Sequence, residues 1–273
     1  MDKKLRNWLL LGVLAAGIAV GIGGCYLYKH RAVEKSTSEQ TQTIGEKKSF
    51  TVCNWNMEVF GKEKGDNAPL LKEYAEVLGK YDVAFIQEIR DDKSAFNNLA
   101  KLMSHHKARV SSRAGRSNSK EQYGVFCREG MEIIDFRDYN PDSQDRWERP
   151  PIKVSVKKGN YVLQVYNIHT RPSDVKRELQ NLEGVVENHG NVMVLGDLNA
   201  SGKRTKYQAF IKWDWIIKDG EDTTSTKAIS TFDRIILNND ADREFIRYGI
   251  NTNTTRAESN HYPVWIEMAS EEK

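Results

Sequence analysis

A set of polar residues that follows the apolar runs of this chain predicts chemistry on phosphate. The set combines hard oxygen donors with two histidines and contains no cysteine. Its members are Asn56, Glu88, His169, Asp197, Asn199, Asp233, Asn260 and His261. Oxygen donors favour magnesium, calcium or manganese over zinc, and two histidines beside carboxylates indicate an acid and a base. Arg149 could bind an anion through its planar guanidinium. Together these residues predict metal-assisted hydrolysis of a phosphate ester.

Apolar runs of two periodicities must bring these residues together. Compact or alternating runs predict strands over residues 50–56, 83–86, 123–128, 131–137, 152–157, 161–169, 192–195, 232–237 and 264–268. Helical spacing predicts one helix over residues 70–80 and another from its N-cap Ser173 to about residue 188. Mixed strands with intervening helices predict an α/β protein of layered sheets with helices outside. Polar residues just past the strand ends then converge on one crevice.

The composition fits one globular domain with an attachment. The chain has 273 residues, of which 39% are hydrophobic and 29% are charged, which excludes a disordered chain and a polytopic membrane protein. Three cysteines are too few for a disulfide-built scaffold. Cys53 and Cys127 fall inside apolar strands, either as buried free thiols or as a bridged pair.

The attachment lies at the N-terminus, in residues 1–32. No residue from Trp8 to Tyr28 is charged, and about 20 such residues cross a bilayer, so a hydrophobic membrane-anchoring helix is predicted. The alternative is a lipoprotein signal, because Ile22-Gly23-Gly24-Cys25 resembles a lipobox in which Cys25 becomes the lipidated first residue. Residues 33–48 are polar and predict a flexible tether, which leaves residues 49–273 as the folded domain. The short basic head favours an extracytoplasmic domain, at the cell surface or in the periplasm.

Charge along the chain points to one basic stretch. The net charge is +3, and residues 1–48 account for all of it, because the rest of the chain has 33 basic and 34 acidic residues. Between Lys101 and Lys120 there are six basic residues and no carboxylate; these are Lys101, Lys107, Arg109, Arg113, Arg116 and Lys120. Such a run is either a solvated face or a contact for backbone phosphates. In the second case, we predict that Arg113 and Arg116 make the phosphate contacts.

Five short motifs resemble, in order, those of the endonuclease/exonuclease/phosphatase superfamily. They are Asn56-Met57-Glu58-Val59-Phe60-Gly61, Gln87-Glu88-Ile89-Arg90-Asp91, Gly196-Asp197-Leu198-Asn199-Ala200, Asp233-Arg234-Ile235 and Ser259-Asn260-His261-Tyr262-Pro263-Val264. Residues 120–123, 167–174 and 223–226 resemble the deoxyribonuclease I branch in particular. The resemblance implies a four-layer α/β/β/α sandwich, in which two packed mixed β-sheets are flanked by helices.

The resemblance also implies a role for each residue. Glu88 would be the main metal carboxylate, and Asn56 and Asn260 would join it as metal ligands. His169 would pair with Glu121, and His261 with Asp233, as the two acid/base groups. Asp197 and Asn199 would orient the attacking water, ligate metal or hydrogen-bond the phosphate. Arg149 would contact phosphate, and Arg90 would lie along the DNA groove.

Three departures from the family pattern carry expectations of their own. Asn260 stands where an aspartate is usual, so the site loses one negative charge and metal affinity is expected to fall. The two cysteines that bracket the segment between Asn199 and Asp233 in that branch are absent, with Ser201 and Ala228 near their places. Ser119 replaces an aromatic residue before Lys120, which predicts weaker duplex binding or weaker sequence discrimination.

These features together predict a membrane-tethered, magnesium-dependent endonuclease, with calcium or manganese as alternative ions, that cuts DNA with little sequence preference. RNA stays open as a substrate, because no residue is seen to read or exclude a 2′-hydroxyl. One alternative is another phosphodiesterase of the superfamily, such as a sphingomyelinase or lipid phosphatase. A second is a degenerate member that binds DNA without cutting it. No protein partner is inferred.

Overall fold

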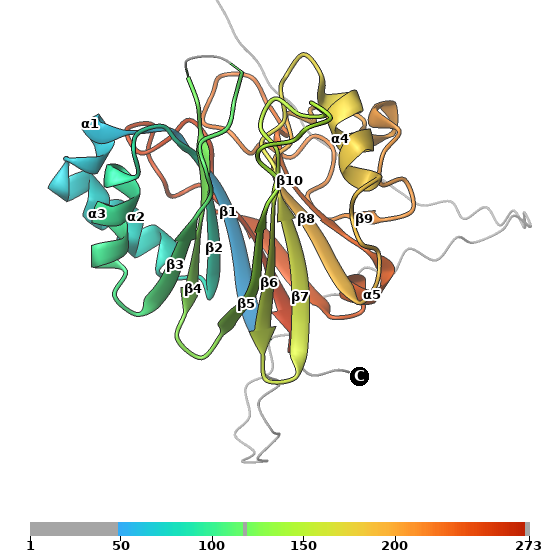
Figure 1. Cartoon of the computed structure of the whole chain (residues 1–273), viewed down its shortest axis with the longest axis horizontal. Coiled ribbons are helices and arrows are strands. Elements are labelled where there is room, and N and C mark those ends of the chain that lie inside the picture. Colours follow the sequence, from blue (N-terminus) through green and yellow to red (C-terminus); the bar gives the residue numbers. More distant parts are fainter. Residues whose placement is uncertain (1–48, 117–118, 271–273) are drawn as a thin grey trace, which may run out of the picture. The chain divides into compact units, whose positions relative to one another are not determined.

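Two six-stranded β-sheets pack face to face in this protein (Figure 1). The computed structural model describes residues 49–116 and 119–270. The first sheet has the order β11-β12-β1-β2-β4-β3. Its strands are β1 (Ser49–Phe60), β2 (Val83–Ile89), β3 (His106–Val110), β4 (Gln122–Arg128), β11 (Phe245–Ile250) and β12 (Val264–Ala269). The pair β1–β2 is parallel and the other pairs are antiparallel, so the sheet is mixed.

The second sheet is also mixed, with the order β5-β6-β7-β8-β10-β9. Its strands are β5 (Glu132–Asp138), β6 (Ile152–Lys158), β7 (Tyr161–Asn167), β8 (Asn191–Asp197), β9 (Asp214–Trp215) and β10 (Asp233–Leu237). Here β7 and β8 form the parallel pair. Each sheet therefore contains one parallel pair near its centre, whose strands end at the same edge.

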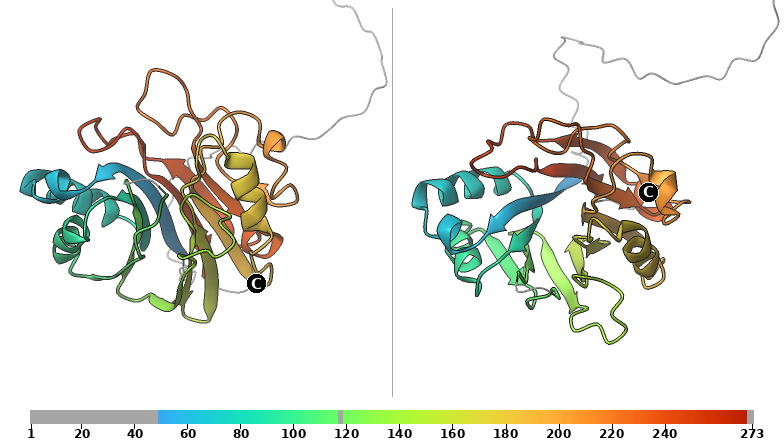
Figure 2. Two further views of the ribbon diagram at one scale, coloured as in Figure 1. Left: turned by 45° about the horizontal axis from the view of Figure 1, so that its top comes forward. Right: turned by 90° about the horizontal axis from the view of Figure 1, so that it is seen from above.

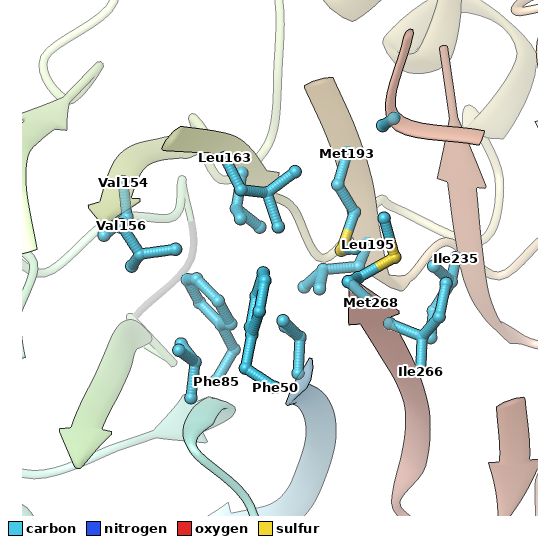
Figure 3. Close-up of a cluster of buried hydrophobic side chains, with 14 of the residues drawn as sticks. Phe50, Phe85, Val154, Val156, Leu163, Met193, Leu195, Ile235, Ile266 and Met268 are labelled. Carbon is cyan, nitrogen blue, oxygen red and sulfur yellow. The ribbon is translucent and has the colours of Figure 1, made fainter. Parts of the chain in front are cut away.

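The main core fills the space between the sheets (Figure 3). Phe50 and Phe85 of the first sheet lie against Leu163 and Met193 of the second, and all four are almost completely buried. Burial of side chains of this size contributes about 1.5–3 kcal/mol each. The two sheets are thus held in fixed positions, and so are the residues at their ends.

Helices form the outer layers. The helices α1 (Lys62–Gly65), α2 (Ala68–Leu78) and α3 (Ser94–Leu102) lie outside the first sheet, and α4 (Val175–Glu183) lies outside the second (Figure 2). Leu71 and Leu99 pack with Ile86 in one outer cluster, while Leu179 and Leu182 pack with Val194 in the other. The short elements η1 (Arg204–Tyr207) and α5 (Asn239–Asp242) complete the second half. The predicted α/β/β/α sandwich is confirmed for the described residues.

The strand ends that carry polar residues meet at one end of the sandwich. In the first sheet Asn56 pairs with Gln87, which precedes Glu88. In the second sheet Asp233 lies directly opposite Asp197. The loops that follow these strands gather at the upper end in Figure 1. The polar strand-end residues therefore converge at one end of the sandwich, as predicted.

Several local predictions need correction. The second predicted helix is capped by Asp174 rather than Ser173 and ends at Glu183, because Gly184 and the turn residues after it end the helix before residue 188. Cys53 and Cys127 are both free and buried. They belong to core clusters on opposite faces of the first sheet, which excludes a bridge between them.

The N-terminal predictions lie outside the described residues. These are the membrane anchor or lipoprotein signal of residues 1–32 and the tether of residues 33–48. Within the ranges that the structure covers, no helix combines the length and the apolar character needed to cross a membrane.

Candidate active site

Two histidine–carboxylate pairs lie at the end of the sandwich, and each pair joins one sheet to the other. His169 follows β7 and its Nδ1 lies 2.9 Å from Oε2 of Glu121, which precedes β4. His261 precedes β12 and its Nδ1 lies 2.8 Å from Oδ2 of Asp233 in β10. All four side chains are nearly buried. A carboxylate on Nδ1 fixes the orientation of each ring and leaves Nε2 for chemistry.

Both free nitrogens face the same carboxylate oxygen. Oδ2 of Asp197 lies 3.4 Å from Nε2 of His169 and 3.7 Å from Nε2 of His261. The same oxygen accepts a hydrogen bond of 3.0 Å from Nδ2 of Asn56. The two imidazoles predicted from the sequence are therefore gathered around one carboxylate, which stands where an attacking water could be held between them.

Backbone geometry explains how Asp197 reaches this position. Gly196 has a φ of +144°, and a Cβ there would lie 2.0 Å from the carbonyl oxygen of Ile168. Glycine is required because the β8 backbone lies this close to Ile168, the residue before His169. The buried amide of Gln87 completes the link, since it accepts from the Asp197 N–H at 2.9 Å and donates to the Ile168 carbonyl at 2.9 Å.

Glu88 lies beside the two pairs in a strained but well-bonded position. Its φ is +63°, an uncommon value for a residue with a side chain. Its Oε1 accepts from Asn56 Nδ2 at 3.0 Å, and its Oε2 accepts from the Val59 N–H at 2.9 Å. Burial would raise the pKa of Glu88, but the charges of His169 and Arg90 and these hydrogen bonds outweigh it and lower the pKa to about 2. Glu88 is therefore a carboxylate throughout the physiological range.

The His261–Asp233 pair is electrostatically the most distinctive feature of the site. Burial would lower the pKa of His261, but the carboxylates of Asp233 and Asp197 outweigh burial and raise the pKa to about 10. Asp233 is completely buried, and its Oδ1 has no hydrogen-bond partner among the described residues. Burial accordingly raises the pKa of Asp233. The pair therefore holds a proton at neutral pH, across the contact of 2.8 Å between Nδ1 and Oδ2.

Two arginines surround the other pair. Glu121 Oε1 lies 2.9 Å from Nη2 of Arg90 and 2.9 Å from Nη1 of Arg149. Arg149 also donates to the carbonyls of His169 and Thr170, and Arg90 pairs with Glu88. The observed contacts of both guanidiniums are thus with the protein. The predicted phosphate contact of Arg149 and groove contact of Arg90 stay predictions that depend on their remaining N–H groups.

In the basic run between Lys101 and Lys120, Arg113 and Arg116 differ in their surroundings. Arg116 pairs with Asp145 at 2.7 Å and with Glu148 at 3.4 Å, so acidic neighbours already neutralise it. Arg113 is exposed, and within residues 49–116 and 119–270 it donates only to backbone carbonyls, at 3.2 Å and 3.5 Å. Arg113 thus keeps its charge for a phosphate, while the predicted phosphate contact of Arg116 competes with two carboxylates. Sequence could not reveal this competition, because Asp145 and Glu148 lie far along the chain.

A divalent cation fits the carboxylate side of the site. Ligand atoms of Glu88, Glu121 and His169 lie within 4.8 Å of one another. Glu88 is the better ligand of the two acids, since Glu121 already faces two guanidiniums. Asn56 turns its amide nitrogen to Glu88 and Asp197, while its oxygen accepts from the Glu58 N–H at 3.0 Å. In this orientation Asn56 bridges two carboxylates through its amide nitrogen, and its role as a metal ligand stays a prediction that depends on the second lone pair of its oxygen.

Asn260 does offer an oxygen. Its Oδ1 is buried and has no hydrogen-bond partner in the part of the chain that is described. An unsatisfied buried carbonyl is costly in the absence of a ligand, which makes Asn260 suitable as a metal ligand. Its backbone N–H donates to Oε2 of Glu58 at 3.1 Å, and Glu58 in turn pairs with Arg256.

Sequence reasoning missed several residues that position the site. Ser259 donates from Oγ to the Asn56 carbonyl at 2.7 Å and accepts from the His261 N–H at 3.0 Å. The Tyr123 hydroxyl accepts from the His169 N–H at 3.0 Å. The signal available was a polar residue inside or beside an apolar run, as at Gln87. That signal does not reveal the partner, because the partner is remote in sequence.

The segment between Asn199 and Asp233 is stabilised without a disulfide. Arg234 is completely buried, and its guanidinium donates to the carbonyls of Ala200 at 2.7 Å and of Ile217 at 2.8 Å. It also pairs with Asp219 at 3.1 Å. One buried cation thereby fixes both ends of the loop that carries Asn199.

These features define a phosphoesterase site at the end of an α/β/β/α sandwich. A model of the Endonuclease/Exonuclease/phosphatase family matches residues 53–253, and the chain belongs to this family. Among curated proteins the chain is similar to Deoxyribonuclease-1 of Equus caballus, with 27% identity over 266 residues that cover 81% of this chain and 92% of that protein. It is similarly related to Deoxyribonuclease-1 of Sus scrofa, with 28% identity over 264 residues that cover 81% and 92%. These relationships support a phosphodiesterase.

Solved structures agree on the fold. An endonuclease/exonuclease/phosphatase family protein from Bacteroides thetaiotaomicron superposes with a TM-score of 0.63 at 14% identity, over 82% of this chain and 99% of that one. A mannosyl-6-phosphatase from the same organism superposes with a TM-score of 0.60 at 15% identity, over 80% and 98%. These structures show the fold alone, and one of them is named as a mannosyl-6-phosphatase and not as a nuclease.

Proposed function

We propose that this protein is a metal-dependent endonuclease that hydrolyses phosphodiester bonds of DNA with little sequence preference. The observation that carries the proposal is the convergence of two histidine–carboxylate pairs on Asp197, at 3.4 Å and 3.7 Å, beside the ionised Glu88. The similarity to Deoxyribonuclease-1 over most of the chain supports DNA as the substrate.

The site residues divide the work of hydrolysis between them. Asp197 and the imidazole of His169 orient a water for in-line attack, and His169 accepts its proton at Nε2. His261, whose pKa is about 10, carries a proton at neutral pH and donates it from Nε2 to the phosphate or to the departing oxygen. Asn199 hydrogen-bonds a phosphate oxygen. Proton transfer by such positioned groups contributes about 10²–10⁴-fold in rate.

Magnesium is the ion we propose for the carboxylate side, held by Glu88 with Asn260. A bound divalent ion would supply positive charge that offsets the charge of the phosphodiester as it is attacked. Glu88 suits this role because its pKa of about 2 leaves it ionised without competition from protons.

A plasmid-nicking assay tests the function. The purified protein is incubated with supercoiled plasmid in magnesium, and again with chelator. We expect open-circular product in magnesium and none with chelator. Hydrolysis of sphingomyelin vesicles without plasmid nicking would instead identify a lipid phosphodiesterase. Retardation of DNA on a gel without nicking would identify a member that only binds.

We also propose that the domain is extracytoplasmic and held at a membrane by residues 1–32. The support is the uncharged run from Trp8 to Tyr28 and the lipobox-like sequence that ends at Cys25. Fractionation of cells that express wild-type protein and Cys25→Ala tests this. Wild-type protein in the soluble fraction would contradict the proposal. Release of only the variant would identify a lipoprotein, and retention of both would identify an uncleaved anchor.

A further inference from the structure

A basic hollow adjoins the active site at the start of α4. It is lined by Pro172, Ser173, Asp174, Val175, Lys176, Arg177, Gln180, Asn199, Ser201, Lys206 and Tyr207, and we call it the α4 hollow. Its volume is about 480 Å³, within the range of roughly 300–1,000 Å³ that is usual for ligand sites. A larger hollow of about 660 Å³ between the end of α4 and α5 includes no residue of the active site.

The walls of the α4 hollow begin at the catalytic strands. One wall starts at Pro172, three residues after His169, and the other starts at Asn199, two residues after Asp197. Asn199 belongs to both regions, since its backbone N–H donates to Asp197 Oδ1 at 3.0 Å while its side chain donates to the Thr170 carbonyl at 2.9 Å. A polymer bound with one phosphate at Asp197 therefore has a direct route into the hollow past Asn199.

The charge of the hollow suits an anion. Three of its lining residues are cations and one is an acid, and the acid, Asp174, is already paired with Arg177. Lys176 is exposed and makes no hydrogen bond or ion pair with any residue in the described ranges. Lys206 is exposed, donates to the Ser201 carbonyl at 2.9 Å and lies over the Tyr207 ring at 4.8 Å. Its ammonium thus contacts only neutral groups.

This situation differs from that of the basic run on the other side of the site. There Arg116 is neutralised by Asp145 and Glu148. In the α4 hollow, neither Lys176 nor Lys206 is paired with a carboxylate among the described residues. These two lysines therefore add positive charge on the α4 side of the active site, besides that of Arg113 in the basic run.

We propose that the α4 hollow binds a backbone phosphate of the nucleic-acid strand next to the phosphate that is cleaved, through Lys176 and Lys206. The inference rests on the proposed function, because it assigns a second contact to the same bound strand. Such a contact explains a preference for polymers over single phosphoesters without any reading of bases, since phosphate contacts position a strand but carry no sequence information.

The test measures DNA binding without turnover, so that chemistry does not enter. The full-length protein in mild detergent is titrated onto fluorescein-labelled 12-nucleotide DNA, single-stranded and duplex, in chelator at several salt concentrations. The double variant Lys176→Gln/Lys206→Gln is compared with the matched control Lys72→Gln/Lys80→Gln. The control removes the same charge from exposed lysines on and after α2, outside the other sheet. Unfolding midpoints of both variants establish that each is folded.

Removing the contacts with one backbone phosphate should lower the slope of log K against log salt by about 0.7 on the single strand and about 0.9 on the duplex. The control should keep the wild-type slope. A slope for Lys176→Gln/Lys206→Gln equal to that of the control would overturn the α4 hollow as a phosphate site. If the wild-type protein nicks plasmid while this slope is unchanged, only the present inference fails. If the wild-type protein neither binds nor nicks DNA, the proposed function fails with it.

Discussion

The two histidines of the site make the same contact in different surroundings. Each holds a carboxylate through Nδ1 and turns Nε2 toward Asp197. Glu121, the partner of His169, also contacts the guanidiniums of Arg90 and Arg149. Asp233, the partner of His261, is completely buried, and the imidazole is the only cation that the described residues place against it.

This difference shows how one arrangement can serve two proton-transfer roles. The carboxylate of Glu121 contacts the guanidiniums of Arg90 and Arg149 as well as His169. The charge of Asp233 acts on His261 alone, and with Asp197 it raises the pKa of His261 to about 10. The His261 pair therefore holds a proton at neutral pH. The role proposed for His169 rests on the position of its ring beside Asp197. The environment of the carboxylate, and not the histidine, creates the distinction.

Removal of either imidazole should have the largest effect. His169→Ala and His261→Ala should each reduce plasmid nicking by about 10²–10⁴-fold, because each deletes a proton-transfer group. His105→Ala is the matched control, since the His105 side chain is exposed and its Nδ1 lies 3.6 Å from Oε2 of Glu129, away from the site. A variant of either site histidine that is folded and nicks at the wild-type rate would remove that residue from the mechanism.

Neutralising Glu121 and neutralising Asp233 should lower the free energy of unfolding by different amounts. Glu121→Gln should lower the free energy of unfolding by about 3 kcal/mol, because it leaves the largely buried guanidinium of Arg149 without its acid and removes one of the two acids paired with Arg90. Asp233→Asn should cost about 1–2 kcal/mol less, because an imidazole can release its proton whereas a guanidinium cannot. Urea unfolding at pH 7.5 measures both values. Equal losses, or a larger loss for Asp233→Asn, would contradict the comparison.

The pKa of His261 is the most direct measure of the difference between the two pairs. In the wild-type protein its ring should titrate near pH 10 by NMR, and Asp233→Asn should lower that pKa by at least about one unit, or 1.4 kcal/mol. Because the folded pKa is raised, the ion pair contributes full stability below about pH 6.5, and this contribution is lost as the pH rises through 10. Titration of the wild-type ring near pH 6.5 would disprove the assignment of His261 as the protonated member.

The smallest expected effect is on magnesium affinity, through Asn260, which precedes His261 in the chain. Asn260→Asp should tighten magnesium binding about fivefold, because a unit charge at about 4 Å is worth roughly 1 kcal/mol in water-like surroundings. Isothermal titration calorimetry measures the affinity, with Asn253→Asp as a control from the same loop, where the side chain is exposed. Weaker binding in Asn260→Asp would show that Asn260 does not face the ion.

Local patterns in the sequence predicted most of the sandwich. The helix predicted over residues 70–80 is α2, which begins after its N-cap Asn67, and the buried strands appear close to their predicted bounds. The strands β3 and β11 were not predicted, because both are half-exposed edge strands without a compact apolar run. The helix α3 was missed as well. Its start is bonded by Asp91, whose carboxylate accepts from the Ser94 hydroxyl and the Ala95 N–H, and no motif marks that cap.

The sequence by itself determined which residue types reach the end of the sandwich, because the period of a strand and the position of its last residue are local properties. It also determined the pairing of His169 with Glu121 and of His261 with Asp233, through the family resemblance. Only the tertiary structure decided that both rings face Asp197. It also decided that Arg90 and Arg149 pair with Glu121. The same holds for the pairing of Arg116 with Asp145, whereas Lys176 has no ion pair among the described residues. The physical reason is that Coulomb and hydrogen-bond energies depend on distance in space, and these partners are brought together only when the two sheets pack.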